Sequence, residues 1–262
     1  MRDREPHVFG VHPVLETLKA RPGAVSEILT AREVERGGAL GEIGRLARAN
    51  GVPVRRVPRS AIGEVVGDAN HQGVLALLRE AEAAAPTVDD PLDLVDAARA
   101  AGRDPLILVL DGIQDPHNLG ALLRSAHALG ADGVVIPKDR AVDLTPVAIK
   151  ASAGASAHCP LVRVVNLVRT LKSLKEQGVW VFGADVGEGA EDLDRVDLTG
   201  PTALVIGAEG AGLRRLVLET CDRRVKIPMA APIGSLNASV AGGVALYEIR
   251  RQRRAKESAP GS

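Results

Sequence analysis

The stretch LILVLDGIQDPHNLGALLRSA, residues 106–126, indicates how the larger part of this 262-residue chain folds. LILVL (106–110) is a continuous apolar run, which is typical of a strand buried on both faces of a parallel sheet. The helical stretch expected after it, 118–129, carries one arginine among alanines and leucines. A structural turn needs only Gly, Asp or Pro. Asn118 at the expected helix start and Arg124 inside the helix therefore point to chemistry.

Further strands and helices alternate downstream of this stretch. The strands are expected at 133–137, 161–165, 179–184, 202–207 and 224–228, and the helices at 166–177, about 212–220 and 236–252. Most of the strands are apolar runs, so we expect an α/β domain over 105–262 with a mostly parallel sheet.

The first 80 residues alternate between short helices and short strands, which predicts a second, smaller α/β domain. The helices are expected at 12–20, 40–50 and 59–66, and the strands at 25–30, 52–57 and 73–79. Residues 81–104 are rich in alanine and acids and contain two prolines. This segment is expected to be a linker with one short helix near 91–101.

The charges balance overall but are unevenly distributed. A net charge of zero argues against a nucleic-acid partner. However, residues 45–59 hold five arginines and no acid, and residues 250–256 are also basic. Each patch alone fits a solvated surface, and the two together also fit a polyanion. With only four aromatic residues, RNA binding would depend on phosphate contacts and shape.

Several classes of protein are disfavoured. No window approaches the ~20 apolar residues of a membrane span, and the charged N-terminus lacks the core of a signal peptide. We therefore expect a cytoplasmic protein with no membrane partner. Cys159 and Cys221 lack the spacing of a disulfide framework or a zinc site and are expected to be small buried side chains. The histidine spacing predicts no metal site.

The loop IGAEGAGL (206–213) follows an expected strand and is rich in glycine. It lacks both Gly-Lys-Ser/Thr and GxGxxG, which disfavours a nucleotide-dependent kinase and an NAD-binding Rossmann enzyme. A tight turn alone would explain the glycines. Glu209 is the unusual residue, because a turn does not require a carboxylate.

The loop IPMAAPIGSLNASVAGG (227–243) also follows an expected strand. Ser235 could cap the final helix, with Asn237 and Ser239 in its first turn. The small residues 241–243 would let another backbone approach closely, which suits a packed helix–helix interface.

Taken together, three segments resemble the SpoU/TrmH family of RNA ribose 2′-O-methyltransferases, within the SPOUT superfamily. They are HNLGALLRSA (117–126), VIGAEGAGL (205–213) and IPMAAPIGSLNASVA (227–241). FGVHPVLETL (9–18), HQGVLAL (71–77) and ASAGASAHCPLVRVVNL (151–167) resemble the members that methylate guanosine in 23S rRNA. The resemblance covers nearly the whole chain except the linker and the tail.

The resemblance implies an N-terminal RNA substrate-binding domain, residues 1–80, similar to ribosomal protein L30e. It implies a SPOUT methyltransferase domain over 105–262, whose last segments thread a deep trefoil knot, a rare fold. S-adenosyl-L-methionine would bind within the knot. The protein would be a homodimer with the knot and the C-terminal helix at the interface.

The resemblance also implies the site residues. The catalytic residues would be Arg124, Asn118, Glu209, Ser235 and Asn237, and the cofactor-binding residues would be Gly207, Ile227, Met229 and Leu236. The asparagines would orient the substrate and the arginine, the serine would contact the guanidinium, and the glutamate would hold the substrate or the arginine. The arginine would either take the proton of the 2′-hydroxyl or stay cationic and stabilise the alkoxide. The sequence leaves both roles open.

The activity that the resemblance implies is S-adenosylmethionine-dependent 2′-O-methylation of a guanosine of 23S rRNA in the peptidyl-transferase region. Two alternatives stay open at this point. One is a sister enzyme that acts on tRNA or on another rRNA site. The other is a non-enzymatic RNA-binding protein of the L30e type.

Overall fold

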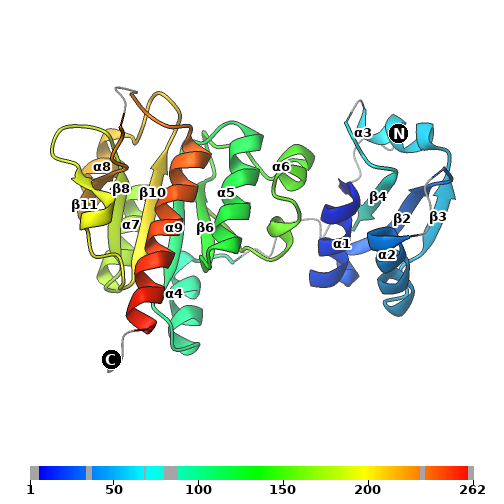
Figure 1. Ribbon diagram of the computed structural model, residues 1–262, viewed down its shortest axis with the longest axis horizontal. Coiled ribbons are helices and arrows are strands. Elements are labelled where there is room, and N and C mark those ends of the chain that lie inside the picture. Colours follow the sequence, from blue (N-terminus) through cyan, green and yellow to red (C-terminus); the bar gives the residue numbers. More distant parts are fainter. Residues whose placement is uncertain (1–5, 34–36, 68, 80–87, 231–233, 259–262) are drawn as a thin grey trace.

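The structure is a computed structural model that describes residues 6–33, 37–67, 69–79, 88–230 and 234–258. It contains two separate sheets, each flanked by helices, at the two ends of an elongated molecule (Figure 1). The expected domain boundary near residue 80 lies outside the described residues.

The N-terminal part is built on a four-stranded sheet. Its strands are β1 (His7–Phe9), β2 (Val25–Ala31), β3 (Val54–Val57) and β4 (Val74–Leu78), and its helices are α1 (Val11–Ala20), α2 (Gly38–Ala49) and α3 (Arg59–Val66). The spatial order is β1-β4-β2-β3, with β4 antiparallel to both neighbours and β2 parallel to β3. The sequence does not predict β1, because three residues are too few to establish a period.

The uninterrupted apolar run of β4 is explained by helices on both faces of this sheet. Val74 and Ala76 pack with α1 and α2, whereas Leu75 and Leu77 pack with Ile62 of α3. Alternate residues of a strand point to opposite faces, so a strand covered on both sides is apolar throughout.

The C-terminal part is built on a seven-stranded sheet. Its strands are β5 (Leu106–Asp111), β6 (Gly133–Pro137), β7 (Leu161–Val164), β8 (Trp180–Ala184), β9 (Glu191–Asp192), β10 (Thr202–Gly207) and β11 (Arg223–Lys226). Its helices are α4 (Pro91–Ala100), α5 (Pro116–Ala128), α6 (Pro146–Ala151), α7 (Leu167–Glu176), α8 (Arg215–Thr220) and α9 (Ala238–Glu257). The order is β7-β6-β5-β10-β8-β11-β9, and the described strand pairs are all parallel, which confirms the predicted sheet.

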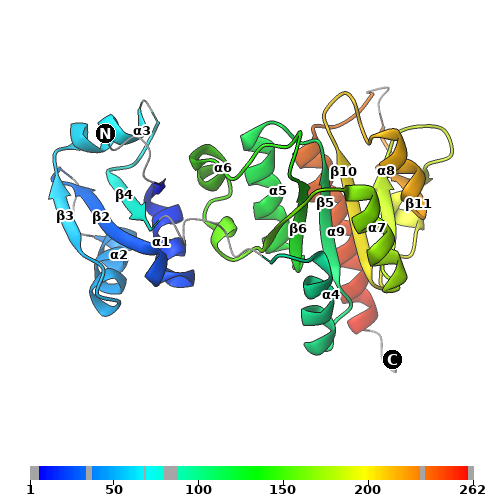
Figure 2. The same ribbon diagram turned by 180° about the vertical axis from the view of Figure 1, so that it is seen from behind.

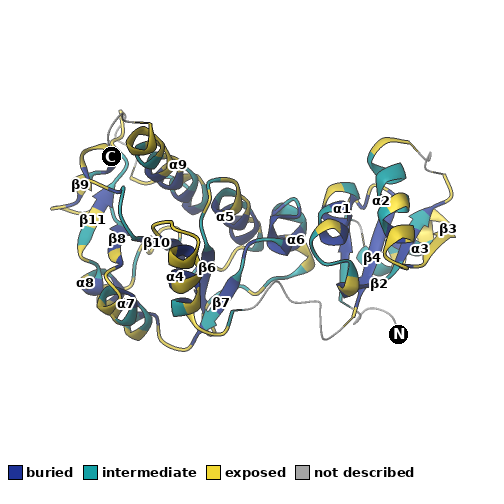
Figure 3. Ribbon diagram, turned by 90° about the horizontal axis from the view of Figure 1, so that it is seen from below, coloured by how far each residue is buried: buried dark blue, intermediate teal, exposed yellow. Residues whose placement is uncertain are grey.

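Helices cover both faces of this sheet. Helices α5 and α9 lie on one face (Figure 1), and α4, α7 and α8 lie on the other (Figure 2). Residues of β5 alternate between two cores: Leu108 packs on the α5 and α9 side, and Val109 on the side of α4 and α7. Helix α4, expected near 91–101, buries Leu94 in the second core. The buried strands between partly exposed helices are visible in Figure 3.

Small residues allow α5 to pack closely against its neighbours. A Cβ on Gly242 of α9 would lie 2.4 Å from Cδ2 of Leu122, and one on Gly120 would lie 2.4 Å from the carbonyl oxygen of Ala148 in α6. The expected close helix–helix contact at 241–243 is therefore confirmed. The six-residue α6 itself is not predicted from the sequence.

Three expected helix starts are wrong. Helix α5 begins at Pro116 and is capped by Asp115, whose Oδ1 accepts from the backbone N–H of His117 at 2.9 Å, so Asn118 lies in the first turn. Helix α9 begins at Ala238 and is capped by Asn237, so Ser235 does not cap it. Helix α8 begins at Arg215, because the residues before it form a loop.

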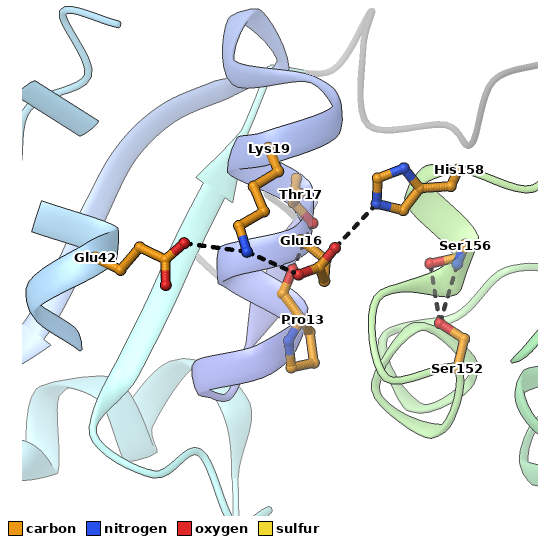
Figure 4. A network of polar contacts seen from close by, with 8 residues as sticks. All are labelled: Pro13, Glu16, Thr17, Lys19, Glu42, Ser152, Ser156 and His158. Atoms are coloured by element: carbon orange, nitrogen blue, oxygen red, sulfur yellow. Dashed lines mark hydrogen bonds and ion pairs between the residues drawn. The ribbon is translucent and has the colours of Figure 1, made fainter. Parts of the chain in front are cut away.

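The two parts of the chain contact each other through β1 and α1 on one side and through α6 and the segment that follows it on the other. Ile149 packs into the core formed by α1 and α2. Gly154, with φ of +93°, lies so close to α1 that a Cβ there would be 2.4 Å from Cβ of Glu16. Glu16 pairs with Nε2 of His158 at 3.2 Å and with Nζ of Lys19 at 3.5 Å (Figure 4). The N-terminal part thus packs on the C-terminal part through apolar and charged contacts.

Two further observations complete the fold. Strand β11 ends at Lys226 and α9 begins at Ala238, and residues 231–233 between them lie outside the described residues. The knot that the resemblance implies for the last segments of the chain stays a prediction. Within the described residues, no helix combines the length and the apolar character needed to cross a membrane.

Candidate active site

The loops after β10 and β11 enclose a cavity of about 370 Å³, together with the ends of β8, β10 and β11 and the start of α9. Loops at the carboxyl ends of parallel strands are the usual ligand-binding positions in an open α/β sheet. The four residues expected to bind the cofactor all line this cavity; they are Gly207, Ile227, Met229 and Leu236. Its walls are largely apolar, with Ile206 and Ala241 among them.

The loop after β10 folds back on itself directly over Gly207. Ala208 and Gly212 exchange two backbone hydrogen bonds of 3.1 and 2.8 Å. A Cβ on Gly207 would lie 2.3 Å from the carbonyl carbon of Gly212 and 2.5 Å from the nitrogen of Leu213. Because these neighbours are backbone atoms, only glycine fits where the loop crosses the strand end.

An ion pair that the sequence does not predict anchors this loop. Asp111, at the end of β5, is fully buried, and its Oδ2 accepts from the backbone N–H of Arg214 at 2.8 Å. Its Oδ1 accepts from Nε of Arg214 at 2.6 Å. A buried carboxylate requires such partners, so the pair ties the loop after β10 to the neighbouring strand. The available signal was an aspartate directly after an apolar run.

Three of the expected catalytic side chains form one hydrogen-bonded cluster. Nδ2 of Asn237 donates to Oδ1 of Asn118 and to Oε1 of Glu209, both at 3.0 Å. Asn118 is buried, whereas Glu209 is exposed and also lines the cavity. Residues far apart in the sequence thus meet beside the cavity, one from each of the three motifs.

The orientation of the Asn237 amide is determined by its second task, which is to cap α9. Its Oδ1 accepts from the backbone N–H groups of Ser239 at 2.9 Å and Val240 at 3.3 Å, and from the Ser239 hydroxyl at 2.6 Å. The capping oxygen faces the helix, so the NH₂ group is directed toward Asn118 and Glu209.

Ser235 and Arg124 are placed differently from this cluster. Ser235 is exposed and lines the same cavity. Arg124 is exposed on α5, and no ion pair joins it to another residue in the described ranges. It lies six residues after Asn118, which places it about 240° further around the helix axis. Among the described residues, no hydrogen bond or ion pair joins the arginine to the asparagine cluster.

The two cysteines play no part in this site. Burial raises the pKa of the Cys159 thiol to about 12, and burial also raises the pKa of Cys221 to about 12. Thiols with such a pKa stay protonated near neutral pH and are poor nucleophiles. In the part of the chain that the structure describes, no three His, Cys, Asp or Glu side chains are grouped to hold a metal ion.

Comparison with known proteins agrees with this geometry. Residues 105–247 match the SpoU rRNA Methylase family, and residues 7–84 match the RNA 2′-O ribose methyltransferase substrate-binding domain. The chain is 44% identical to the 23S rRNA (guanosine-2′-O-)-methyltransferase RlmB of Vibrio cholerae over 250 residues, which is 95% of this chain and 97% of the relative.

Two solved structures extend the comparison. The SpoU methyltransferase AviRb of Streptomyces viridochromogenes, in complex with the cofactor AdoMet, is 29% identical; the superposition has a TM-score of 0.74 and covers 95% of this chain and 90% of AviRb. The A. aeolicus TrmH/SpoU tRNA modifying enzyme is 26% identical with a TM-score of 0.54, and covers 63% of this chain and 86% of that enzyme. The chain described here belongs to the SpoU rRNA Methylase family.

Proposed function

We propose that the protein transfers a methyl group from S-adenosylmethionine to the ribose 2′-hydroxyl of a guanosine in 23S rRNA. The observation that carries this proposal is the cluster of Asn118, Glu209 and Asn237 beside an apolar cavity of about 370 Å³. The cavity suits a small cofactor, and the cluster supplies donors and acceptors for a hydroxyl substrate. The name of the Vibrio cholerae relative supports guanosine of 23S rRNA as the target.

The extent of the matches favours this target over the alternatives. The named rRNA methyltransferase matches 95% of this chain, whereas the tRNA modifying enzyme matches 63%. The match to the rRNA relative thus includes the N-terminal domain, whereas the tRNA modifying enzyme matches a smaller part of the chain. A non-enzymatic binding protein is disfavoured because an unused site would not need Asn118, Glu209 and Asn237 to be joined in this way. With an rRNA substrate, we expect the protein in the cytoplasm.

The cavity fits S-adenosylmethionine in size and in character. Its volume lies in the range of roughly 300–1,000 Å³ that small-molecule sites occupy. Apolar groups of Ile206, Ile227 and Leu236 offer a slot for the adenine ring, and exposed backbone beside Gly207 offers hydrogen bonds to its edge. Asp185 supplies a carboxylate for the amino group of the ligand. When bound, the cofactor supplies an electrophilic methyl group.

The chain itself must position the hydroxyl and manage its proton. We assign orientation of the ribose to Asn118 and Asn237, since their amides are already fixed by hydrogen bonds. Glu209 would receive a polar group of the substrate. Guanidinium groups keep their proton up to about pH 12, so we assign Arg124 the cationic role of stabilising negative charge on the 2′-oxygen.

The surface of α9 and the position of Arg124 away from the asparagine cluster support a homodimer. Helix α9 exposes Val240, Val244 and Tyr247, which are 50%, 40% and 61% accessible. Their spacing of i, i+4 and i+7 forms one apolar stripe on the helix. We propose that a second copy of the chain covers this stripe.

The domain division of the proposal follows the two sheets. We propose that residues 1–80 bind the RNA substrate, that 81–104 connect the domains, and that 105–262 carry out methyl transfer. The matched ranges 7–84 and 105–247 support this division.

The role of Arg124 is tested with Arg124→Ala and Arg124→Lys. In a single-turnover assay with radiolabelled S-adenosylmethionine, Ala should lower transfer by 10²-fold or more, the typical effect of losing one charge-stabilising group. Lys retains the charge and should recover part of the rate. Cofactor binding by calorimetry should stay within about twofold, because Arg124 does not line the cavity. Normal turnover by Arg124→Ala would contradict the assigned role.

A further inference from the structure

We propose that a groove between α2 and β3 of the N-terminal domain binds the phosphodiester backbone of the RNA substrate; this inference rests on the proposed function. The groove has a volume of about 550 Å³. Ile43 and Val52 form part of its floor, and Arg45, Arg48 and Arg56 lie along its sides.

The regular geometry of the two elements brings these arginines together. In α2, Gly41, Gly44, Arg45 and Arg48 follow the i, i+3, i+4, i+7 spacing of one helix face, and each lines the groove. In β3, Val54 and Arg56 line the same groove. Arg55 points to the opposite face of the sheet, where its Nε pairs with Glu27 at 2.8 Å.

Arg45 and Arg48 carry the positive charge that the groove offers to a ligand, whereas Arg56 is engaged and donates to the carbonyl oxygen of Arg32 at 2.6 Å. None of the described residues that line it is acidic. Glu42, the acid on the same helix, is held by Lys19 at 3.1 Å on the side of α1 (Figure 4). Arg45 and Arg48 are exposed, and among the described residues neither belongs to an ion pair. The groove therefore presents positive charge to a ligand.

The second basic segment of the sequence, at the end of α9, is largely engaged within the fold. Arg253 donates to the carbonyl oxygens of Asp104, Pro105 and Gly200 at 2.8, 3.0 and 2.7 Å. Arg251 pairs with Glu248 at 2.7 Å. Arg253 thus fastens α9 to the residues that precede β5 and β10, and the Arg251 pair lies within α9 itself. Because these charges are already engaged, the structure assigns RNA contact to the N-terminal patch.

The shape of the groove fits a sugar–phosphate backbone. A Cβ on Gly44 would meet nothing within 4 Å, so the helix face is open to close approach. No aromatic residue is among the described residues that line the groove, which disfavours base stacking. Arginine forks bind phosphate oxygens without regard to sequence. The groove would thus position the RNA, while selection of the nucleotide occurs at the catalytic site.

The test compares two full-length double variants that each remove two positive charges. Arg45→Gln/Arg48→Gln alters the groove, and Arg254→Gln/Lys256→Gln, at exposed positions of α9, is the matched control. Binding of a fluorescently labelled 23S rRNA fragment is measured by anisotropy, without cofactor, over a range of KCl concentrations. All four positions are exposed, so the thermal unfolding midpoints should equal that of the wild type.

We expect the groove variant to bind on the order of tenfold more weakly near 0.15 M salt, and its slope of log K against log salt to fall by about 1.4–1.8. The control should change less than twofold. In methyl transfer, the groove variant should raise KM for RNA and leave kcat unchanged, and Arg45→Lys/Arg48→Lys should restore most of the affinity.

Equal affinities of the groove variant and the control, or absence of RNA binding by the wild type, would overturn the proposal. The anisotropy assay does not depend on catalysis. Selective loss of binding without methyl transfer by the wild type would support the groove and reject the proposed function. Methyl transfer with an unchanged KM in the groove variant would reject the groove alone.

Discussion

Asn237 has two tasks that a pair of substitutions can separate. Its Oδ1 caps α9, and its Nδ2 donates to Asn118 and Glu209. Asn237→Ala removes both functions. Asn237→Asp keeps an oxygen for the cap but replaces the donor with a second carboxylate, opposite that of Glu209.

The magnitudes follow from these contacts. Loss of an N-cap costs about 1 kcal/mol of stability, so Asn237→Ala should be destabilised by about that amount. Aspartate caps as well as asparagine, and its charge at the helix start stabilises by roughly 0.3–1 kcal/mol. Two carboxylate charges about 3 Å apart repel by about 1.4 kcal/mol in a water-like dielectric. Because Glu209 is exposed and can turn away, Asn237→Asp should lose less than half of what Asn237→Ala loses.

Activity, in contrast to stability, should fall equally in the two variants. Both variants lose the donor that joins Asn118 to Glu209, so methyl transfer should fall about 10²-fold in each, the effect of misplacing a reacting group by about 1 Å. The assays are urea unfolding followed by circular dichroism and single-turnover methyl transfer with saturating RNA.

Asn166 supplies the matched control. It caps α7, and its Oδ1 accepts from the backbone N–H of Arg169 at 3.1 Å. Asn166→Ala should lose similar stability and keep full activity. Wild-type turnover in Asn237→Asp would refute the catalytic role of the cluster, and equal stability of Asn237→Ala and the wild type would refute the cap.

Two further predictions concern other parts of the chain. Gly207→Ala should abolish cofactor binding measured by calorimetry, because the new Cβ would lie 2.3 Å from the backbone carbonyl carbon of Gly212. The affinity of this variant for RNA should be retained. Normal cofactor affinity would show that the loop does not form the cofactor site. Burial, with Arg59 and Lys150 nearby, lowers the pKa of His71, so the folded state binds fewer protons and stability is lost as pH falls below the unfolded value of about 6.5. His71→Asn keeps an acceptor for the Gly73 N–H and should show a smaller decrease in thermal midpoint between pH 7.5 and 5.5; an unchanged pH dependence would contradict this assignment.

The longer strands and helices could be predicted from the sequence, because short apolar runs indicate buried strands. LILVL (106–110) is apolar throughout since Leu108 and Val109 face two different cores. The three-residue β1 and the six-residue α6 carry no period that distinguishes them from loops. Their formation depends on contacts with β4 and α5, which lie elsewhere in the chain.

The site was predictable as a set of residues but not as an arrangement. Motif order points to Asn118, Glu209 and Asn237 as partners, and the structure joins them. The double use of Asn237 as cap and donor depends on where α9 begins, which local preferences place at Ser235. The ion pair between buried Asp111 and exposed Arg214 joins residues about a hundred positions apart, so no local pattern predicts the pairing. The separate position of Arg124 follows only from the helix geometry.

The most direct test of the central claim is nucleoside analysis of RNA after reaction. Unmodified 23S rRNA is incubated with the protein and S-adenosylmethionine, digested, and analysed by mass spectrometry, with Arg124→Ala in parallel. The account predicts 2′-O-methylguanosine, formed by the wild type and not by the variant. Methylation of a base, or of tRNA in place of 23S rRNA, would contradict it.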